Sequence, residues 1–169
     1  MIGRDIKRTA RISKDEQYRY QLGRHWDRTQ ARKTMFVMLN PSTANAFQDD
    51  ATIRRCMNFA DSWGCGGMYV VNLFALRATD PMRLLEAKDP VGPKNDSYLR
   101  GALVTALKKD WLTVVAWGKN APRYRTRTFA RMMAFGPPVW CLGVNADGSP
   151  RHPLRLSKFT PLERWSYPL

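Results

Sequence analysis

The hydrophobic pattern of the chain is clearest at residues 34–39, which include five consecutive apolar residues. A short unbroken apolar run of this kind predicts a buried strand. Asn40 and Pro41 end the run, because proline cannot continue a central strand. In open α/β sheets, ligands bind where strands run out into polar loops at their carboxyl ends. The stretch therefore indicates either a ligand-binding edge or an ordinary connection from a strand to a helix.

The rest of the pattern alternates between apolar runs and amphipathic segments. Further strands are predicted at residues 18–22, 68–74, 112–117 and 138–142. Helices are predicted at residues 50–63, 82–87, 95–109 and 122–134. Strands separated by helices predict a parallel sheet that is covered on both faces. We therefore expect residues 1–169 to form a single α/β domain, a three-layer αβα sandwich around a central four-stranded, mainly parallel sheet.

Two segments show little regular pattern. Residues 1–14 are basic and poor in apolar side chains, which predicts a flexible or edge segment. Residues 23–25 are interpreted as a bend after the strand at 18–22. The tail from residue 144 onward is interpreted as mostly irregular.

Composition favours a globular protein without a cofactor. The chain has 169 residues, of which 44% are hydrophobic and 25% charged. Neither a membrane span nor a signal peptide is visible, and Cys56, Cys65 and Cys141 form neither a disulfide framework nor C-x-x-C pairs. These features predict a reduced, cytoplasmic compartment and no metal site. No glycine-rich nucleotide-binding motif occurs, so no dinucleotide cofactor or NTP hydrolysis is expected.

The net charge is the compositional feature that says most about function. Lys and Arg number 28 against 14 Asp and Glu, a net charge of +14. Such an excess favours a polyanionic partner, a nucleic acid or a nucleotide, although a small protein can also simply be basic. Four arginines on the predicted helix at 122–134 suggest a face that binds phosphates: Arg123, Arg125, Arg127 and Arg131.

Candidate chemistry lies at or just after the carboxyl ends of the predicted strands. Asn40, Asn72 and His152 occupy such positions and are expected to converge on one edge of the sheet. Asn72 interrupts an apolar run, and its amide offers the donors and the acceptor needed to recognise the edge of a base. Asn72 could equally be a structural residue at a turn, and His152 could be a structural histidine.

Short motifs around these residues resemble known families. The chain is identified as similar, over roughly residues 18–157, to an uncharacterised phage and bacterial family, the domain of unknown function 1643 family. That resemblance rests on motifs that begin at Leu39, Asp49, Asn72, Arg77, Gly92 and Gly148. More distantly, the motifs at Asn40, Asn72, Ala116 and Arg151 resemble the uracil-DNA glycosylase superfamily, especially its mismatch-specific branch, whose first motif is also Asn-Pro.

The glycosylase resemblance implies a fold, an activity and a set of residues. It implies a uracil-DNA glycosylase-like fold in which Asn40 positions the attacking water and His152 contacts the departing base. Base recognition would fall on Asn72 and Ser42, with Phe47 stacking on the flipped base. Residues after the histidine would form a wedge that enters the duplex: Leu154, Arg155 or Leu156.

Other residues are expected around this site. The acidic and basic block that contains Asp49, Asp50 and Arg54 has no counterpart in the superfamily, and we expect it to line and reshape the pocket. Contacts to DNA are expected from Leu154 and from four basic residues: Lys119, Arg123, Arg151 and Arg155.

The sequence therefore leads to three functional hypotheses. The first is a DNA glycosylase-like enzyme that hydrolyses the N-glycosidic bond of a deaminated or modified base in DNA, in repair or modification, by base flipping and without a cofactor. The second is a non-catalytic nucleic-acid-binding protein that retains a base pocket. The third is an enzyme that acts on free modified nucleotides.

Overall fold

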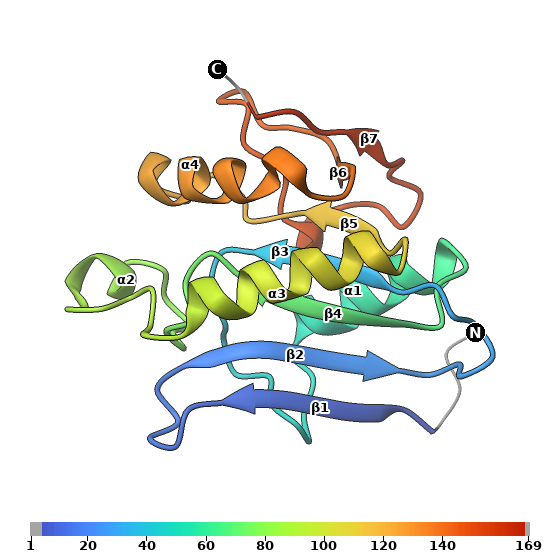
Figure 1. Cartoon of the computed structure of the whole chain (residues 1–169), viewed down its shortest axis with the longest axis horizontal. Helices are drawn as coiled ribbons and strands as arrows, with labels where there is room; N and C mark the ends of the chain where they lie inside the picture. Colours follow the sequence, from blue (N-terminus) through green and yellow to red (C-terminus); the bar gives the residue numbers. More distant parts are fainter. Residues whose placement is uncertain (1–4, 168–169) are drawn as a thin grey trace.

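A computed structural model describes residues 5–167, which form a single mixed sheet with helices packed on it (Figure 1). The strands are β1 (Lys7–Ile12), β2 (Arg19–His25), β3 (Thr34–Met38), β4 (Gly67–Asn72), β5 (Leu112–Val115), β6 (Val139–Cys141) and β7 (Glu163–Arg164). The helices are α1 (Ala51–Ser62), α2 (Arg83–Glu86), α3 (Asn95–Lys108) and α4 (Arg123–Met132), with 3₁₀ turns η1 (Met133–Phe135) and η2 (Pro153–Arg155).

The sheet has seven strands in the order β1-β2-β4-β3-β5-β6-β7. Its centre, β4-β3-β5-β6, is parallel and corresponds to the four predicted strands. β1 and β2 extend one side and β7 extends the other, all in antiparallel pairing. The prediction of a four-stranded sheet was therefore wrong. It left the strand expected at residues 18–22, which is β2, out of the central sheet, and the edge strands β1 and β7 lack the apolar run that marks a buried strand.

The bend predicted at residues 23–25 was also wrong. Gly23 lies inside β2, where β1 and β4 both pair with it. A Cβ atom at this position would collide with the hydroxyl of Thr9, so glycine permits the close approach of β1 rather than a turn. β1 itself is an edge strand, which settles the choice between a flexible and an edge segment for residues 7–12.

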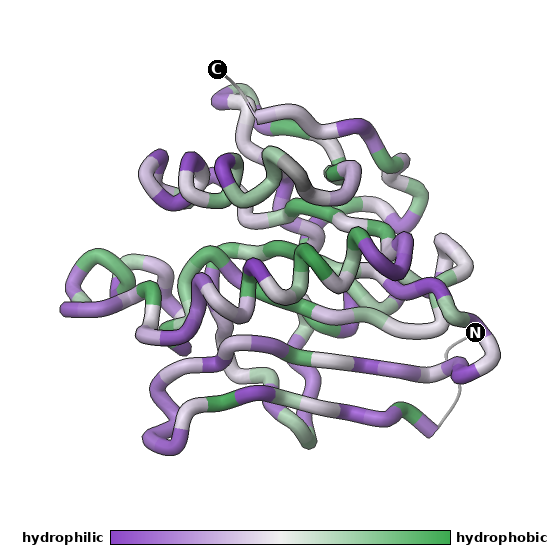
Figure 2. Tube along the Cα trace, viewed as in Figure 1, coloured by the Kyte–Doolittle hydropathy of each residue, from purple (hydrophilic) through white to green (hydrophobic). Residues whose placement is uncertain are grey.

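Two apolar clusters bury the two faces of the sheet. Met35 and Val37 of β3 face the cluster built with α3 and α4, whereas Phe36 and Met38 face the cluster built with α1. This alternation follows from the two-residue period of a strand. Figure 2 shows that hydrophobic residues concentrate in the central strands and hydrophilic residues in β1 and β2.

Helix α1 begins where the sequence predicts it. The Asp50 side chain accepts a hydrogen bond from the Ile53 amide at 2.8 Å, which is a typical N-cap. Gly64 follows the helix with a φ of 70°, a left-handed conformation that favours glycine. Within the described part of the chain, no helix is long and apolar enough to cross a membrane.

Candidate functional site

A cavity of about 410 Å³ lies at the carboxyl edge of the parallel strands. β4 and β5 lie on opposite sides of β3 in the sheet. The chain runs from β3 to β4 on one side and then crosses to β5 and β6 on the other side, so the strand order reverses at β3. Such a switch in strand order leaves a crevice at the carboxyl ends, which is where open α/β sheets bind ligands. The polar residues that line the cavity are Arg19, Asn40, Ser42, Asp50, Thr52, Asn72, Thr79, Lys119, Asn120 and His152.

Asn40 follows β3 directly and is oriented by the backbone around it. Its Nδ2 donates to the carbonyl oxygens of Pro41 at 3.0 Å and Ala78 at 2.8 Å. Because both amide hydrogens are used in this way, the side chain is fixed, and Oδ1 remains as an acceptor for a water or a ligand. The Ala78 amide also donates to the Pro41 carbonyl, which joins the loops after β3 and β4.

Asn72 ends β4 and is 1% exposed, yet its side chain makes no hydrogen bond within residues 5–167. Its backbone, in contrast, is anchored, because Asn95 Nδ2 donates to the carbonyl oxygens of Asn72 and Leu73 at 3.0 Å each. A buried amide without a partner costs about 1–3 kcal/mol. Because Asn72 lines the cavity, a water or a ligand bound there can supply the missing partner.

His152 reaches the cavity from the irregular tail. The Gly118 amide donates to the Pro150 carbonyl at 3.0 Å and the Arg151 amide to the Gly143 carbonyl at 2.9 Å, which bind this tail to the ends of β5 and β6. Both glycines have positive φ angles, 77° and 85°. These contacts bring His152 to the same cavity as Asn40, although 112 residues separate them.

The His152 ring has a defined protonation pattern. Its Nδ1 accepts a hydrogen bond from the Leu154 amide at 3.3 Å, which places the ring proton on Nε2. Burial lowers the pKa of His152 below its ordinary value of 6.5, and the nearby Asp50 carboxylate opposes only part of that shift. His152 is therefore a neutral imidazole at neutral pH, with one N–H to donate.

Arg19 is a cation at the β2 side of the cavity. It is 2% exposed, and burial lowers its pKa to about 10, which still leaves it charged at neutral pH. Sequence reasoning missed Arg19, because nothing in the alternating pattern of residues 18–22 distinguishes a cavity arginine from a solvated one. It also missed Trp117 and Asn120, which follow β5 and line the same cavity.

Three predicted pocket residues lie outside the cavity. Asp49 forms ion pairs with Arg24 at 2.6 Å and Arg8 at 3.2 Å, so it compensates a buried arginine in β2. Arg54 points along α1 to the Asp49 carbonyl, at 2.5 Å. Phe47 is 90% exposed and does not line the cavity, so its position offers no stacking surface there. Asp49, Asp50 and Arg54 were predicted to line the pocket, and of these three only Asp50 lines the cavity.

The residues predicted to contact DNA are spread around the cavity. Lys119 and Leu154 line it, and Lys119 also lines a neighbouring cavity of about 550 Å³ together with Arg123. Arg151 and Arg155 are exposed beside His152. Arg125 contradicts the predicted arginine face of α4: it is 4% exposed, pairs with Asp96 at 2.7 Å and donates to the Leu73 carbonyl.

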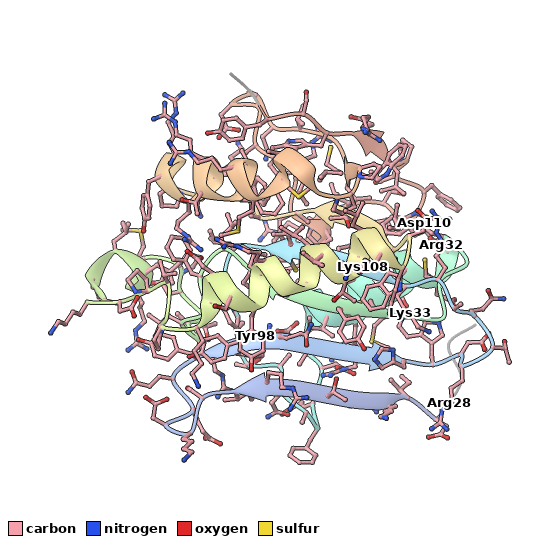
Figure 3. The ribbon with its side chains drawn as sticks, viewed as in Figure 1. Arg28, Arg32, Lys33, Tyr98, Lys108 and Asp110 are labelled. Carbon is pink, nitrogen blue, oxygen red and sulfur yellow. The ribbon has the colours of Figure 1, made fainter. Side chains whose placement is uncertain are left out.

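Some basic residues lie away from the cavity. Figure 3 shows Arg32, Lys33 and Lys108, with Asp110, near the amino ends of the parallel strands, and Arg28 farther along the same side of the molecule. The cavity lies at the carboxyl ends of these strands. A groove of about 540 Å³ runs between α3 and the sheet and is lined partly by Tyr98. The side chains described along this groove leave no buried donor or acceptor without a partner, which favours the cavity at the carboxyl edge as the functional site.

The fold is that of a mixed α/β protein with a polar cavity at the carboxyl edge of a mainly parallel sheet. The chain belongs to the family described as protein of unknown function (DUF1643), whose model matches residues 19–154. Neither the curated proteins nor the solved structures contain a match to the chain. Within residues 5–167, no cluster of three His, Cys, Asp or Glu side chains could hold a metal ion.

Proposed function

We propose that this protein is a DNA N-glycosylase that removes a modified or deaminated base. The observation that carries the proposal is the convergence of Asn40, Asn72 and His152 on one cavity from three separate parts of the chain. The resemblance of the surrounding motifs to the uracil-DNA glycosylase superfamily suggested these three residues. Their roles follow from the hydrogen-bonding groups that each side chain leaves without a partner in the protein.

The reaction begins with a base that is flipped out of the duplex into the cavity. Asn72 recognises its edge through the amide that otherwise lacks a partner. A water that donates a hydrogen bond to Asn40 Oδ1 adds to C1′ of the deoxyribose while the bond from C1′ to the base nitrogen breaks. The bonding electrons leave with the base as an anion, the water loses a proton to solvent, and the anion takes up a proton from solvent, so that the products are the free base and an abasic site.

Charge develops at both ends of the breaking bond. The sugar acquires positive charge, which the carboxylate of Asp50 on the cavity wall stabilises. The departing base acquires negative charge on its carbonyl oxygen, and the His152 Nε2–H donates to it. A neutral imidazole suits this role, because the leaving group is stabilised by a fixed hydrogen bond that needs no proton transfer.

The direct test is base release from DNA. Oligonucleotides that carry single uracil, hypoxanthine, xanthine or hydroxymethylated bases are incubated with the protein, and alkali then cleaves the strand at abasic sites. We expect cleavage at one or more of these bases and none at unmodified DNA. If the full panel remains intact at stoichiometric enzyme, the proposal fails.

Asn72→Ala is expected to reduce discrimination among bases by about 1–3 kcal/mol, the value of one good contact to a base edge. Selectivity is measured as the ratio of single-turnover rates on the best and second-best bases. Thr113→Ala is the matched control, since Thr113 is also buried and its hydroxyl also lacks a partner, but it does not line the cavity. Thr113→Ala should leave selectivity unchanged. Equal effects of both variants on selectivity would mean that Asn72 is only structural.

Duplex binding is expected to weaken steeply with salt, because Lys and Arg contacts release condensed cations from the phosphates. The excess of basic residues motivates this expectation, and Lys119 at the cavity rim is the residue to test. Lys119→Gln should reduce the slope of log K against log salt by about 1. Fluorescence anisotropy between low and moderate salt provides the measurement, with Lys88→Gln, an exposed lysine that lines none of the three cavities described above, as the control.

A second function, action on free modified nucleotides, is favoured by one feature, the buried positive charge of Arg19 in the cavity. Competition separates the two. Unmodified duplex competes with an oligonucleotide substrate for a DNA enzyme, but it does not inhibit an enzyme whose substrate is a nucleotide.

A further inference from the structure

Three arginines in the described chain are almost completely buried: Arg19, Arg24 and Arg125. Arg24 pairs with Asp49 at 2.6 Å, and Arg125 pairs with Asp96 at 2.7 Å. Arg19 has no carboxylate within 4.0 Å among residues 5–167. It is therefore the exception in a protein that otherwise compensates its buried guanidinium groups.

The contacts of Arg19 leave much of its hydrogen-bonding capacity unused. Its Nη1 donates to the Ala44 carbonyl at 2.7 Å, while Nε is buried without a partner. Asp50 also lines the cavity, and its charge acts on Arg19 from beyond ion-pair distance. A buried charge without a close partner is costly, so a residue of this kind in a cavity wall points to a ligand of opposite charge.

The strand order shows which end of the ligand Arg19 would meet. β2 runs antiparallel to β4, so the start of β2 lies at the same edge as the end of β4. The order β2-β4-β3 then places Asn72 between Arg19 and Asn40. With strands spaced by about 4.8 Å, the strand that carries Arg19 lies about 10 Å from the strand that precedes Asn40. Arg19 is therefore at the end of the cavity remote from the water held by Asn40.

We propose that Arg19 forms an anion-binding subsite, and that the ligand of this cavity carries an anionic oxygen group, a carboxylate or a phosphate, at its end remote from Asn40. The orientation of the ligand rests on the proposed function, whereas the subsite itself does not. A guanidinium binds such groups through parallel N–H donors, and the unpartnered Nε supplies one of them.

Binding of nucleosides to the full-length protein tests this subsite without any bond cleavage. Isothermal titration compares 2′-deoxyuridine with 5-carboxy-2′-deoxyuridine and with 2′-deoxyuridine 5′-monophosphate, for wild type and for Arg19→Met. The carboxylated probe leaves the edge of the base free for Asn72. We expect one anionic probe to bind wild type about 10- to 100-fold more tightly than the neutral nucleoside, the range for a charged hydrogen bond. Arg19→Met should remove that preference.

The probes distinguish the possible sources of the anion. Preference for the carboxylated nucleoside locates the charge on the base, and preference for the monophosphate locates it on the sugar. A preference that survives Arg19→Met arises from the overall positive charge and contradicts the subsite, as does equal binding of all three probes to wild type. The comparison of probes on wild type decides the matter even if the variant does not fold.

Stability provides an independent readout. Removing a buried charge that lacks a close partner should leave the thermal midpoint of Arg19→Met close to that of wild type or above it. Arg24→Met, which removes the closer of the two arginine partners of Asp49, should lower the midpoint. A large loss for Arg19→Met would instead indicate a structural arginine. Because these measurements require no catalysis, a failure to release bases from DNA would overturn the proposed function and leave the subsite standing.

Discussion

Asn40→Ala is expected to slow single-turnover base release by about 10²–10⁴-fold on the best substrate of the panel, the range for aligned catalytic assistance. The reason is that Asn40 is held by two backbone carbonyls, which leaves Oδ1 as a fixed acceptor for the attacking water. A water that is free to rotate must lose that freedom in the transition state, and the lost orientation appears in the rate. Rapid quenching followed by alkali cleavage gives the rate constant.

Binding and stability separate this effect from misfolding. Affinity for DNA should be retained, because phosphate contacts elsewhere supply most of it. The loss of two hydrogen bonds should cost about 1 kcal/mol each in stability, so the assay is run well below the thermal midpoint. Asn58→Ala, which replaces an exposed asparagine of α1 outside the cavity, is the matched control. A rate for Asn40→Ala equal to that of the control would remove Asn40 from the mechanism.

His152→Ala is expected to slow base release by about 10²–10³-fold, the usual cost of removing one donor that stabilises a developing anion. His152→Gln, whose side-chain amide can still donate, should recover part of the rate. His25→Gln is the control, because His25 lies in β2 and does not line the cavity. If His25→Gln slows the reaction as much as His152→Gln, the effect comes from the loss of a histidine in general and not from the cavity.

The pH dependence distinguishes a neutral donor from a general acid. Since burial holds the pKa of His152 below 6.5, the ring is already neutral at pH 7. The rate should therefore not fall through loss of the His152 proton as the pH rises from 6.5 to 8. An acid that must transfer a proton would show such a fall.

Protein stability should report the same shift with a definite sign. The pKa of His152 is lower in the folded state than in the unfolded state, so the unfolded state binds protons first as the pH falls. Stability is then fully present above about pH 6.5 and declines between that pH and the lower folded pKa. His25 has a lowered pKa as well, so the contribution of His152 is the difference between wild type and His152→Gln in this window.

The sequence was most informative where one property decided the structure locally. The apolar run at residues 34–39, the Asp50 cap and Gly64 predicted β3 and α1 nearly to their ends, because burial, capping and left-handed backbone are encoded by neighbouring residues. The four parallel strands were predicted for the same reason. Of the outer strands, only β2 was predicted, at residues 18–22, because the polar edge strands β1 and β7 are stabilised mainly by the strands that they pair with.

The candidate site was predicted in part. Asn40, Asn72 and His152 were expected at the edge of the sheet, and the cavity includes all three. From the sequence, Asp49 and Asp50 were equally expected to line the pocket, yet only Asp50 lines the cavity. The difference depends on Arg24, a residue 25 positions earlier that attracts Asp49 into an ion pair. No pattern in the sequence around Asp49 indicates that it pairs with Arg24.

By itself, then, the sequence determined the helices, the parallel centre of the sheet and the edge at which chemistry could take place, because periodicity, caps and strand ends are local properties. Only the tertiary structure decided which polar residues are free to act. Asn72 and Asn95 are both buried asparagines, and Arg19 and Arg125 are both buried arginines. Asn95 Nδ2 and the Arg125 guanidinium donate to backbone carbonyls, and Arg125 also pairs with Asp96, whereas Asn72 Nδ2 and Arg19 Nε have no partner among residues 5–167. This difference depends on contacts between segments far apart in the chain.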